Sequence, residues 1–519
     1  MNTGLFMLLA MGLAMLIRLI PSWRWPVVGP DAGQHLFLRR EIRRHGFRAP
    51  AKLVVCRFNN RMTYPWLYHQ FIAALPESWL RRLPALPSAL IDALHTALVF
   101  LAGSWLARQV SSEWDPARTG LACALLFCLN PALMASGIGP RAYEITPRPF
   151  GELLFTISLW TGLQAVHFAS WTLAAVAVLA GAGVFLSSKF AVQVMFIFVA
   201  ALSLCPGLHL LWLLLLGSLS VALLLSGGRY CHVIRGHINH LAYYMRQLQY
   251  TLGATADLNR WSQARRLGGV IRERGLFSRE TRTAAADLYF SNTYLQMAAR
   301  GIIFLLLAVA LSLSPSPVPV DLLRFRGWLV GWAFVWIFPF LLTSWKHARF
   351  LGEAERYAEY SVAPAALLAG LEMSQGLHSR LLAVLLALFF LAIIANIIHA
   401  ARVAAGENRR YRKARCELVD FLQELPAGCM LMGIPWELAL APVASLLPHC
   451  FADILSDNRT WLGMVESHFD GYPWPKPDWN LWREAGVQYL VTLRPADIET
   501  QRPSIKYDFS PLERLFSND

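Results

Sequence analysis

Three side chains that can do acid–base and anion chemistry are spaced for one helix face in residues 29–46, GPDAGQHLFLRREIRRHG. His35 and Arg39 follow Asp31 by four and eight residues, and side chains at this spacing lie above one another on an α-helix. A carboxylate can take the proton of a hydroxyl group, and a guanidinium can hold a phosphate. The segment therefore predicts a site that combines a base with anion binding.

The same residues also fit a purely local role. Asp31 and Gln34 have the D-x-x-Q spacing of a helix capping box, which needs no chemistry. One residue can serve as both cap and base, so these residues alone do not show whether Asp31 has a chemical role. The rest of the sequence has to provide that evidence.

The composition predicts a protein that crosses a membrane many times. Of the 519 residues, 56% are apolar and 12% aromatic, and several apolar runs exceed the roughly 18 residues typical of a membrane span. Lipid offers no water to backbone groups, so the spans must be helices. We predict a mainly α, polytopic fold with about eleven transmembrane helices in residues 1–403. The predicted spans are residues 3–20, 88–110, 120–137, 150–168, 171–186, 190–204, 208–226, 301–313, 327–344, 361–373 and 381–403.

Three polar segments between the spans hold most of the candidate chemistry. The first, residues 21–87, contains Asp31 and an amphipathic stretch at residues 63–83 that is typical of an interfacial helix. The second lies around Pro140 and Pro149, and the third covers residues 346–364. Their candidate side chains are Arg141, Tyr143, Glu144 and Arg148 in the second segment, and Glu353, Arg356 and Tyr357 in the third.

A cytoplasmic N-terminus would place all three polar segments on the outer side of the membrane. The Arg-rich amphipathic insertion at residues 227–300, which we predict to form surface helices, and residues 404–519 fall on the same side. Short cytoplasmic loops normally carry more Lys and Arg than outer loops, whereas here the outer segments carry more. Arginines that hold a lipid-linked phosphate would account for this excess. The net charge of +14 accordingly favours anionic lipid over nucleic acid as a partner.

Residues 404–519 predict a small soluble α/β domain. The stretches CMLMGI and VQYLVTL are typical of short buried strands, and helical patterns alternate with them, which favours a parallel sheet. Cys429 and Cys450 would pair only in an oxidising compartment. His237 and His240, in the insertion, are spaced i, i+3, but no third metal ligand is evident beside them, so we expect no metal site.

These features together resemble the GT-C superfamily of glycosyltransferases, which use sugars linked to polyprenyl phosphate. The resemblance is carried by PDAGQHL with the following RREIRRHG, and by TYPWLYH, which is similar to a Tyr-Pro-Pro-Leu-Tyr type of stretch in the first outer loop of that family. The TPRPF start of the fourth span and the GVQYLV of the soluble tail add to it.

The resemblance implies that Asp31, the acidic residue of the first outer loop, is the catalytic base for the acceptor hydroxyl. It also implies that a later acidic residue, here Glu144, binds the acceptor or a metal. The second polar segment reads RAYEIT and lacks a D-x-D pair, so we expect a metal-independent enzyme without a cofactor, although a divalent metal remains open.

The sugar would leave its lipid phosphate in one in-line displacement with inversion, and fixed cations near the phosphate would stabilise the developing charge. For this role we predict Arg356, Arg141 and Arg148, with His35 and Tyr357 as hydrogen-bond donors. The other predicted substrate-binding residues are Arg39, Tyr143, Glu144 and Glu353. Arg356 has an alternative in an ion pair within its own helix, and Lys189 is better explained as a lysine reaching from a span end to the interface.

The resemblance further implies a multi-pass protein of the bacterial inner membrane, with its active site and soluble domain facing the periplasm. The acceptor would be a glycan, lipid or protein. Two alternatives remain. A lipid-linked polysaccharide polymerase or ligase would use outer-loop arginines but needs no acidic base after the first span. A transporter would carry its charges near the bilayer midplane, whereas here they cluster in loops.

Overall fold

The structure, a computed structural model, shows a mainly helical chain. It describes residues 3–23, 30–53, 62–110, 114–134, 145–255, 262–291, 319–343, 346–352, 356–373, 379–434, 444–451, 486–493 and 507–508, together with residues 294–295, 297, 301, 303–304, 307, 311 and 440. The predicted site residues Arg141, Tyr143, Glu144 and Glu353 lie outside this part of the chain.

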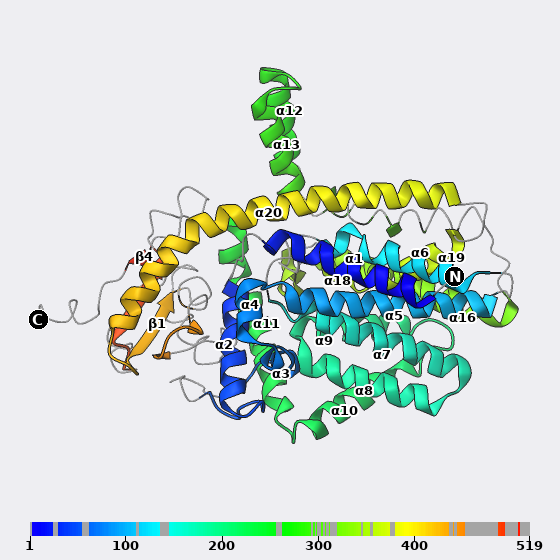
Figure 1. The fold of residues 1–519 in the computed structure, drawn as a ribbon, viewed down its shortest axis with the longest axis horizontal. Coiled ribbons are helices and arrows are strands. Elements are labelled where there is room, and N and C mark those ends of the chain that lie inside the picture. The colour runs from blue at the N-terminus through cyan, green and yellow to red at the C-terminus, as the bar shows by residue number, and fades with distance from the viewer. Residues whose placement is uncertain are drawn as a thin grey trace, which may run out of the picture.

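Most of the described residues belong to helices, which follow one another with short connections (Figure 1). The helices are α1 (Thr3–Trp23), α2 (Pro30–Arg44), α3 (Leu67–Ala74), α4 (Glu77–Arg82), α5 (Leu86–Val110), α6 (Pro116–Cys128), η1 (Pro131–Met134), α7 (Arg148–Phe168), α8 (Trp171–Ser187), α9 (Lys189–Leu202), α10 (Leu211–Leu225), α11 (Tyr230–Thr255), α12 (Ser262–Arg274), α13 (Arg279–Ser291), α16 (Val320–Phe334), α17 (Ile337–Thr343), η2 (Lys346–Leu351), α18 (Arg356–Glu359), α19 (Val362–Met373) and α20 (Ser379–Glu424).

Fewer helices have the length of a membrane span than the sequence predicts. Within the described residues, three are long and apolar enough, namely Thr3–Pro21, Leu86–Val110 and Leu322–Thr343, and a fourth results if α10 and the start of α11 count as one bent span. The other apolar runs form shorter helices, such as Trp171–Ser187 and Lys189–Leu202. Most of residues 301–313 lie outside the described part. The predicted number of spans is therefore not confirmed, whereas the mainly helical, membrane-embedded character is.

The apolar helices lie side by side, and α2 stands across one end of the group (Figure 1). Glycines allow the closest approaches between them. A Cβ on Gly120 of α6 would lie 2.2 Å from Oγ of Ser104 on α5, and a Cβ on Gly370 of α19 would lie 2.5 Å from Sγ of Cys123 on α6. Cys123 is fully buried there, as expected for a small core residue.

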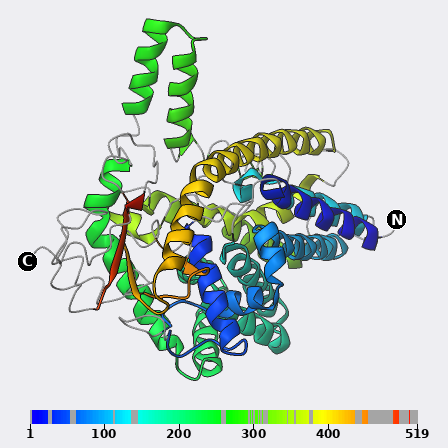
Figure 2. The ribbon, with the colours of Figure 1, turned by 60° about the vertical axis from the view of Figure 1, so that its left-hand side comes forward.

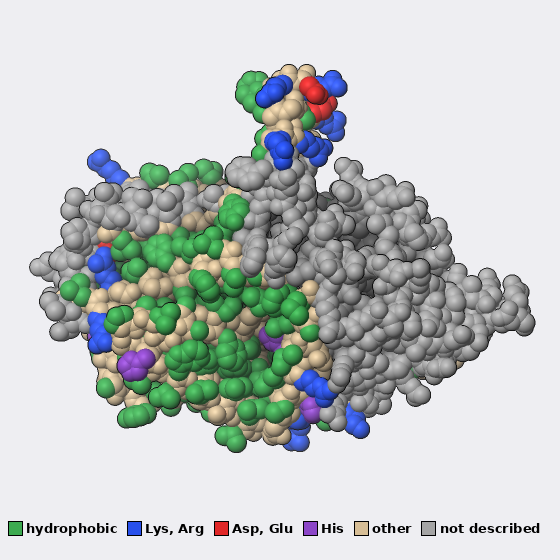
Figure 3. All heavy atoms as spheres, turned by 180° about the vertical axis from the view of Figure 1, so that it is seen from behind, with side chains coloured by type: hydrophobic (Ala, Val, Ile, Leu, Met, Phe, Trp, Pro, Cys, Tyr) green, Lys and Arg blue, Asp and Glu red, His purple; other side chains and the backbone are tan. Residues whose placement is uncertain are grey.

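A broad hydrophobic face covers much of one side of this helical group, and Lys and Arg side chains gather at its edges (Figure 3). Helix α10 contributes exposed leucines to the surface, including Leu213 and Leu224, at 64% and 78% exposure. Single exposed leucines are ordinary, but a contiguous apolar face between basic edges is typical of contact with lipid.

The insertion at residues 227–300 is helical in its described part, as predicted. After α11, the helices α12 and α13 form a hairpin that projects from the rest of the molecule (Figures 1 and 2). The turn of the hairpin contains Gly275 at φ +80° and exposes Phe277.

The C-terminal region begins within a continuous helix. Helix α20 has 46 residues and passes through positions 403 and 404, where the sequence analysis divides the chain. It leads into the strands β1 (Met430–Ile434), β2 (Cys450–Phe451), β3 (Tyr489–Leu493) and β4 (Tyr507–Asp508). Their order is β2-β1-β3-β4; β1 pairs in parallel with β2 and β3, and β4 is antiparallel to β3. The two strands that the sequence predicts thus form and pair in parallel. Cys429 and Cys450 are free thiols in this structure.

A buried ion pair joins the first two spans. Nε of Arg18 on α1 lies 2.6 Å from Oδ2 of Asp92 on α5, and neither side chain is more than 1% exposed. Both terminal nitrogens of Arg18 also donate to the carbonyl of Cys128 at 3.5 Å. A buried charge is tolerated only when it is paired and hydrogen-bonded, so this cluster fixes α1, α5 and α6 relative to one another.

The substitution Asp92→Leu should lower the free energy of unfolding by about 3–5 kcal/mol, because it leaves the Arg18 charge buried without its carboxylate. The double variant Arg18→Met/Asp92→Leu should recover most of this loss, since an apolar pair needs no compensation. Thermal unfolding of the purified protein in detergent measures both. Arg118→Gln, in an exposed pair with Asp115, is the control and should change the melting temperature little. Equal melting temperatures for the single and double variants would contradict this account.

Candidate functional site

Helix α2 begins one residue before the predicted base. Pro30 occupies its first position, where the missing N–H of proline costs nothing, and Asp31 follows at the second position. The capping-box alternative requires Asp31 as the residue before the helix, so the backbone does not support it. Asp31 lies in the first turn of α2, and its role as the base stays a prediction.

A pair of buried histidines joins α2 to α3. Nδ1 of His35 lies 3.0 Å from Nε2 of His69, and Nδ1 of His69 lies 3.1 Å from the carbonyl oxygen of Pro65. His35 is 4% exposed and His69 is completely buried. The ring of Tyr64 packs edge-on against His35, with the ring centres 5.8 Å apart.

The Pro65 carbonyl determines where the protons of both histidines lie. A carbonyl oxygen only accepts hydrogen bonds, so Nδ1 of His69 carries a proton and donates it. Burial lowers the pKa of His69 well below its usual value, so its ring is neutral and its Nε2 accepts the proton that Nδ1 of His35 donates. Burial, followed by the charge of Arg148, lowers the pKa of His35 to about 3. Nε2 of His35 is therefore an unprotonated acceptor.

This result corrects the role predicted for His35. Its only proton is used by His69, so His35 cannot donate a hydrogen bond to a phosphate, as the sequence analysis expects. An unprotonated imidazole nitrogen instead accepts a hydrogen bond from a hydroxyl group, such as those of sugars.

Arg39 also differs from its predicted role. Its Nε donates to the carbonyl of Ile72 at 3.0 Å and its Nη2 to the carbonyl of Leu75 at 2.8 Å, at the end of α3. Its third nitrogen lies 3.7 Å from the carboxylate of Glu77, and the side chain is 3% exposed. Arg39 is thus used to hold α3 against α2, and its geometry does not fit a phosphate contact.

The end of the second polar segment packs against α2 and α3, close to His35. Ile145 packs in one small core cluster with Ala32 of α2 and Tyr68 of α3. In the sequence, Ile145 directly follows Glu144, and Ala32 directly follows Asp31. Arg148, at the first position of α7, is half-buried and close enough to lower the pKa of His35. The first two polar segments therefore meet beside His35.

Lys189 belongs to this group, whereas its place at the end of an apolar run predicts a lysine at the membrane interface. The residue before it, Ser188, is extended and caps α9 by accepting a hydrogen bond from the backbone N–H of Ala191 at 3.4 Å. This cap places Lys189 at the first position of α9, where its Nζ lies 5.0 Å from the ring centre of Tyr64. In the sequence, this position is marked by SSK, which interrupts two apolar runs that are each shorter than a typical membrane span.

The third polar segment approaches from the next residue of α9. The guanidinium of Arg356 lies over the ring of Phe190, 5.8 Å from its centre. The hydroxyl of Tyr357 donates to the carbonyl of Leu351 at 2.9 Å and accepts from the amide of Gln193 at 2.7 Å. The single proton of Tyr357 is therefore used within the protein, which corrects its predicted role as a donor to substrate.

The first and third polar segments thus meet at the N-terminus of α9, and the second segment meets the first beside His35. Lys189 contacts Tyr64 of the first segment, and Phe190 contacts Arg356 and Tyr357 of the third. The described part of this site combines an accepting imidazole with three cationic side chains, Arg148, Lys189 and Arg356. Such a set can hold a phosphate and orient a hydroxyl group.

No group of three or more His, Cys, Asp or Glu residues that could hold a metal is found in the part of the chain that the structure describes. The Glu144 segment lies outside that part, so metal independence stays a prediction.

Comparisons with protein-family models and with curated proteins found no match. Among solved structures, the chain is similar to the oligosaccharyltransferase of Archaeoglobus fulgidus in its apo form, with a TM-score of 0.53 and 12% identity over 98% of this chain and 74% of that one. The archaeal oligosaccharyltransferase AglB from Archaeoglobus fulgidus, in complex with an inhibitory peptide and a dolichol-phosphate, gives a TM-score of 0.44 at 12% identity, over 98% of this chain and 74% of that one. ArnT from Cupriavidus metallidurans bound to undecaprenyl phosphate gives 0.44 at 14% identity, over 98% and 96%.

At these identities the similarity concerns the fold. The chain has the fold of the GT-C glycosyltransferases, which its sequence predicts.

Proposed function

We propose that this chain is an inverting glycosyltransferase that moves a sugar from a polyprenyl-phosphate donor to an acceptor hydroxyl. The observation that carries the proposal is that, on a GT-C fold, the first polar segment meets the third at the N-terminus of α9 and meets the second beside His35. The proposed site faces the outside of a bacterial inner membrane, with the C-terminal domain on the same side.

The proposed reaction is a single displacement at the anomeric carbon. Asp31 takes the proton of the acceptor hydroxyl, and the oxygen of that hydroxyl forms the new bond to the sugar. The bond between the anomeric carbon and the phosphate oxygen breaks, and the lipid phosphate leaves with the electron pair. Attack from the opposite face inverts the configuration of the anomeric carbon.

The cationic side chains supply stabilisation where the charge develops. Arg148, Lys189 and Arg356 are proposed to hold the lipid phosphate as its negative charge increases. Nε2 of His35 is proposed to accept a hydrogen bond from a sugar hydroxyl, since it carries no proton of its own. Arg141, Tyr143, Glu144 and Glu353 remain proposed substrate contacts from their positions in the second and third segments.

The variant Asp31→Asn should lower kcat by about 10²- to 10⁴-fold, because it removes the base while keeping the size and shape of the side chain. Transfer from polyprenyl-phosphate hexoses and pentoses in detergent measures the effect, and melting temperature checks folding. Asp115→Asn is the matched control: Asp115 caps α6, and Asn caps as well as Asp, so activity should persist. Full activity of Asp31→Asn would favour the polymerase or ligase alternative, which needs no such base.

The variant His69→Leu should raise KM by about tenfold for the substrate whose hydroxyl contacts His35, with a smaller effect on kcat. Leucine cannot accept the proton of His35, so the position of that proton is no longer fixed. His69→Gln should behave like the wild type, because its amide can donate to the Pro65 carbonyl and accept from His35. If Gln and Leu impair KM equally, His69 acts only as a packing residue.

Transfer activity should persist in excess EDTA, because the second polar segment lacks a D-x-D pair. Initial rates with EDTA, with Mg²⁺ and with Mn²⁺ test this on the same preparation. Loss of activity on chelation, with recovery on adding either metal, would assign Asp31 and Glu144 to a metal site instead.

A further inference from the structure

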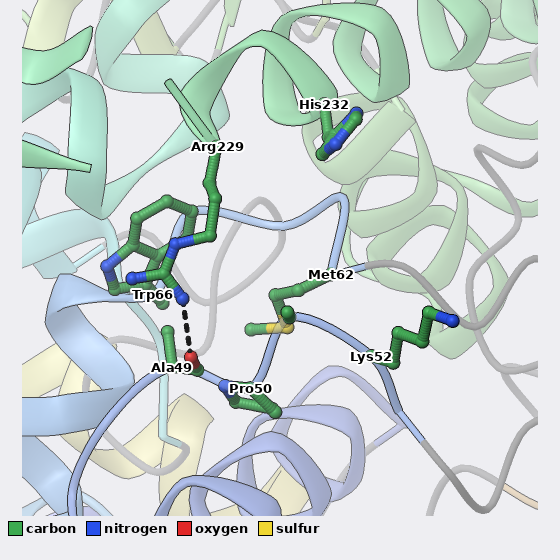
Figure 4. A pocket seen from close by; sticks show the side chains of 8 residues that line it. Ala49, Pro50, Lys52, Met62, Trp66, Arg229 and His232 are labelled. Atoms are coloured by element: carbon green, nitrogen blue, oxygen red, sulfur yellow. Dashed lines mark hydrogen bonds between the residues drawn. The ribbon is translucent and has the colours of Figure 1, made fainter. Parts of the chain in front are cut away.

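A second basic site lies apart from the catalytic residues, between the first polar segment and the start of α11. It is a pocket of about 150 Å³. Its floor is apolar, formed by Met62 and Trp66, which are 5% and 6% exposed. Lys52, Arg229 and His232 also line the pocket; Figure 4 shows Arg229 beside Trp66 on one side, with Lys52 and His232 on the other.

Arg229 is held in a fixed position by uncharged groups. Its Nη1 donates to the carbonyl of Ala49 at 2.9 Å and its Nε to the carbonyl of Ser226 at 3.1 Å. The guanidinium also lies over the ring of Trp66, 5.7 Å from its centre (Figure 4). Among the ion pairs of the described residues, none joins a carboxylate to Lys52, Arg229 or His232. Arg229 therefore brings positive charge to the pocket in a prearranged geometry and Lys52 adds a second cation, which together favour an anion.

The pocket opens where an apolar helix ends. Helix α10 finishes at Leu225, and Gly227 and Gly228, at φ +56° and +75°, allow a bend of 117° into α11. Leu224 and Leu225 are 78% and 67% exposed, only a few residues before Arg229. Exposed leucines next to a basic side chain and a tryptophan ring are typical of the boundary between the hydrocarbon core and the lipid headgroups.

We propose that this pocket binds the phosphate of an anionic membrane phospholipid, whose acyl chains lie along the exposed leucines of α10. The volume supports this choice, because pockets for sugar-sized or drug-sized ligands reach about 300–1,000 Å³. A headgroup phosphate is smaller than such ligands, and Arg229 offers it a cation held in place at the pocket.

A ligand in this pocket contacts the first polar segment, which also contains Asp31 and His35 of the proposed catalytic site. Trp66 forms the floor of the pocket, and Tyr64, two residues earlier, contacts both His35 and Lys189. The bound phospholipid thus holds residues 62–66 in place from the membrane side.

The test is lipid retention by the full chain in nanodiscs of phosphatidylcholine with increasing phosphatidylglycerol, read by native mass spectrometry. The wild type should retain one phosphatidylglycerol more tightly than the rest. Arg229→Gln and Lys52→Gln should each weaken this binding by about tenfold, since each removes one charge-assisted contact. Lys52 is exposed, so its variant tests the site even if the loss of Arg229 disturbs the fold.

Arg324→Gln is the matched control, because Arg324 is also exposed and lies over a tryptophan ring, that of Trp328, at 5.3 Å. It should retain the lipid like the wild type. Equal retention by all variants, or equal loss in Arg324→Gln, would overturn the proposal. So would displacement of phosphatidylglycerol by equimolar undecaprenyl phosphate, which would make the pocket a donor site, or by inorganic phosphate at the same concentration as the lipid. None of these readouts depends on transfer activity.

Discussion

Two adjacent arginines of α2 hold the helix between two parts of the molecule. Arg39 donates to the carbonyls of Ile72 and Leu75 at the end of α3. Arg40 donates to the carbonyls of Ser445 and Leu447 in the C-terminal region, both at 2.9 Å. Successive residues of a helix point about 100° apart, so one helix can hold both partners. The orientation of Asp31 and His35 relative to the other polar segments depends on these contacts, because both residues lie on α2.

The pair of His35 and His69 constrains the protonation of the site as well as its geometry. A single backbone carbonyl, that of Pro65, determines which nitrogen of His69 carries the proton, and His69 in turn determines the state of His35. Burial keeps both rings neutral. A neutral, oriented acceptor beside the cations Arg148, Lys189 and Arg356 separates two tasks: the imidazole binds hydroxyl groups, and the cations bind phosphate.

The sequence predicted the features of the fold that depend on local periodicity, namely the helices. The i, i+4, i+8 spacing of Asp31, His35 and Arg39 correctly predicted a helix, and the apolar runs predicted a helical membrane protein. It could not predict roles that depend on distant partners. Arg39 looked like a phosphate ligand because its partners, two carbonyls more than thirty residues away, leave no local pattern. Lys189 looked like a span-end lysine because only the cap at Ser188 and the position of Tyr64 place it in the site. The number of spans stays a prediction, because within the described residues several apolar runs form helices shorter than a span.

Aromatic rings recur beside the cations of this surface. Lys189 lies over Tyr64, Arg356 over Phe190 and Arg229 over Trp66. The face of a ring attracts a cation without cancelling its charge, as a carboxylate would. Two hydrogen bonds of Arg229 go to backbone carbonyls, which leave its charge in place for a phosphate. Tyrosine and tryptophan are also stable at the boundary between lipid and water, where such a phosphate must lie if its lipid remains in the membrane. The same pairing therefore serves both the proposed catalytic site, with Lys189 and Arg356, and the proposed phospholipid site, with Arg229.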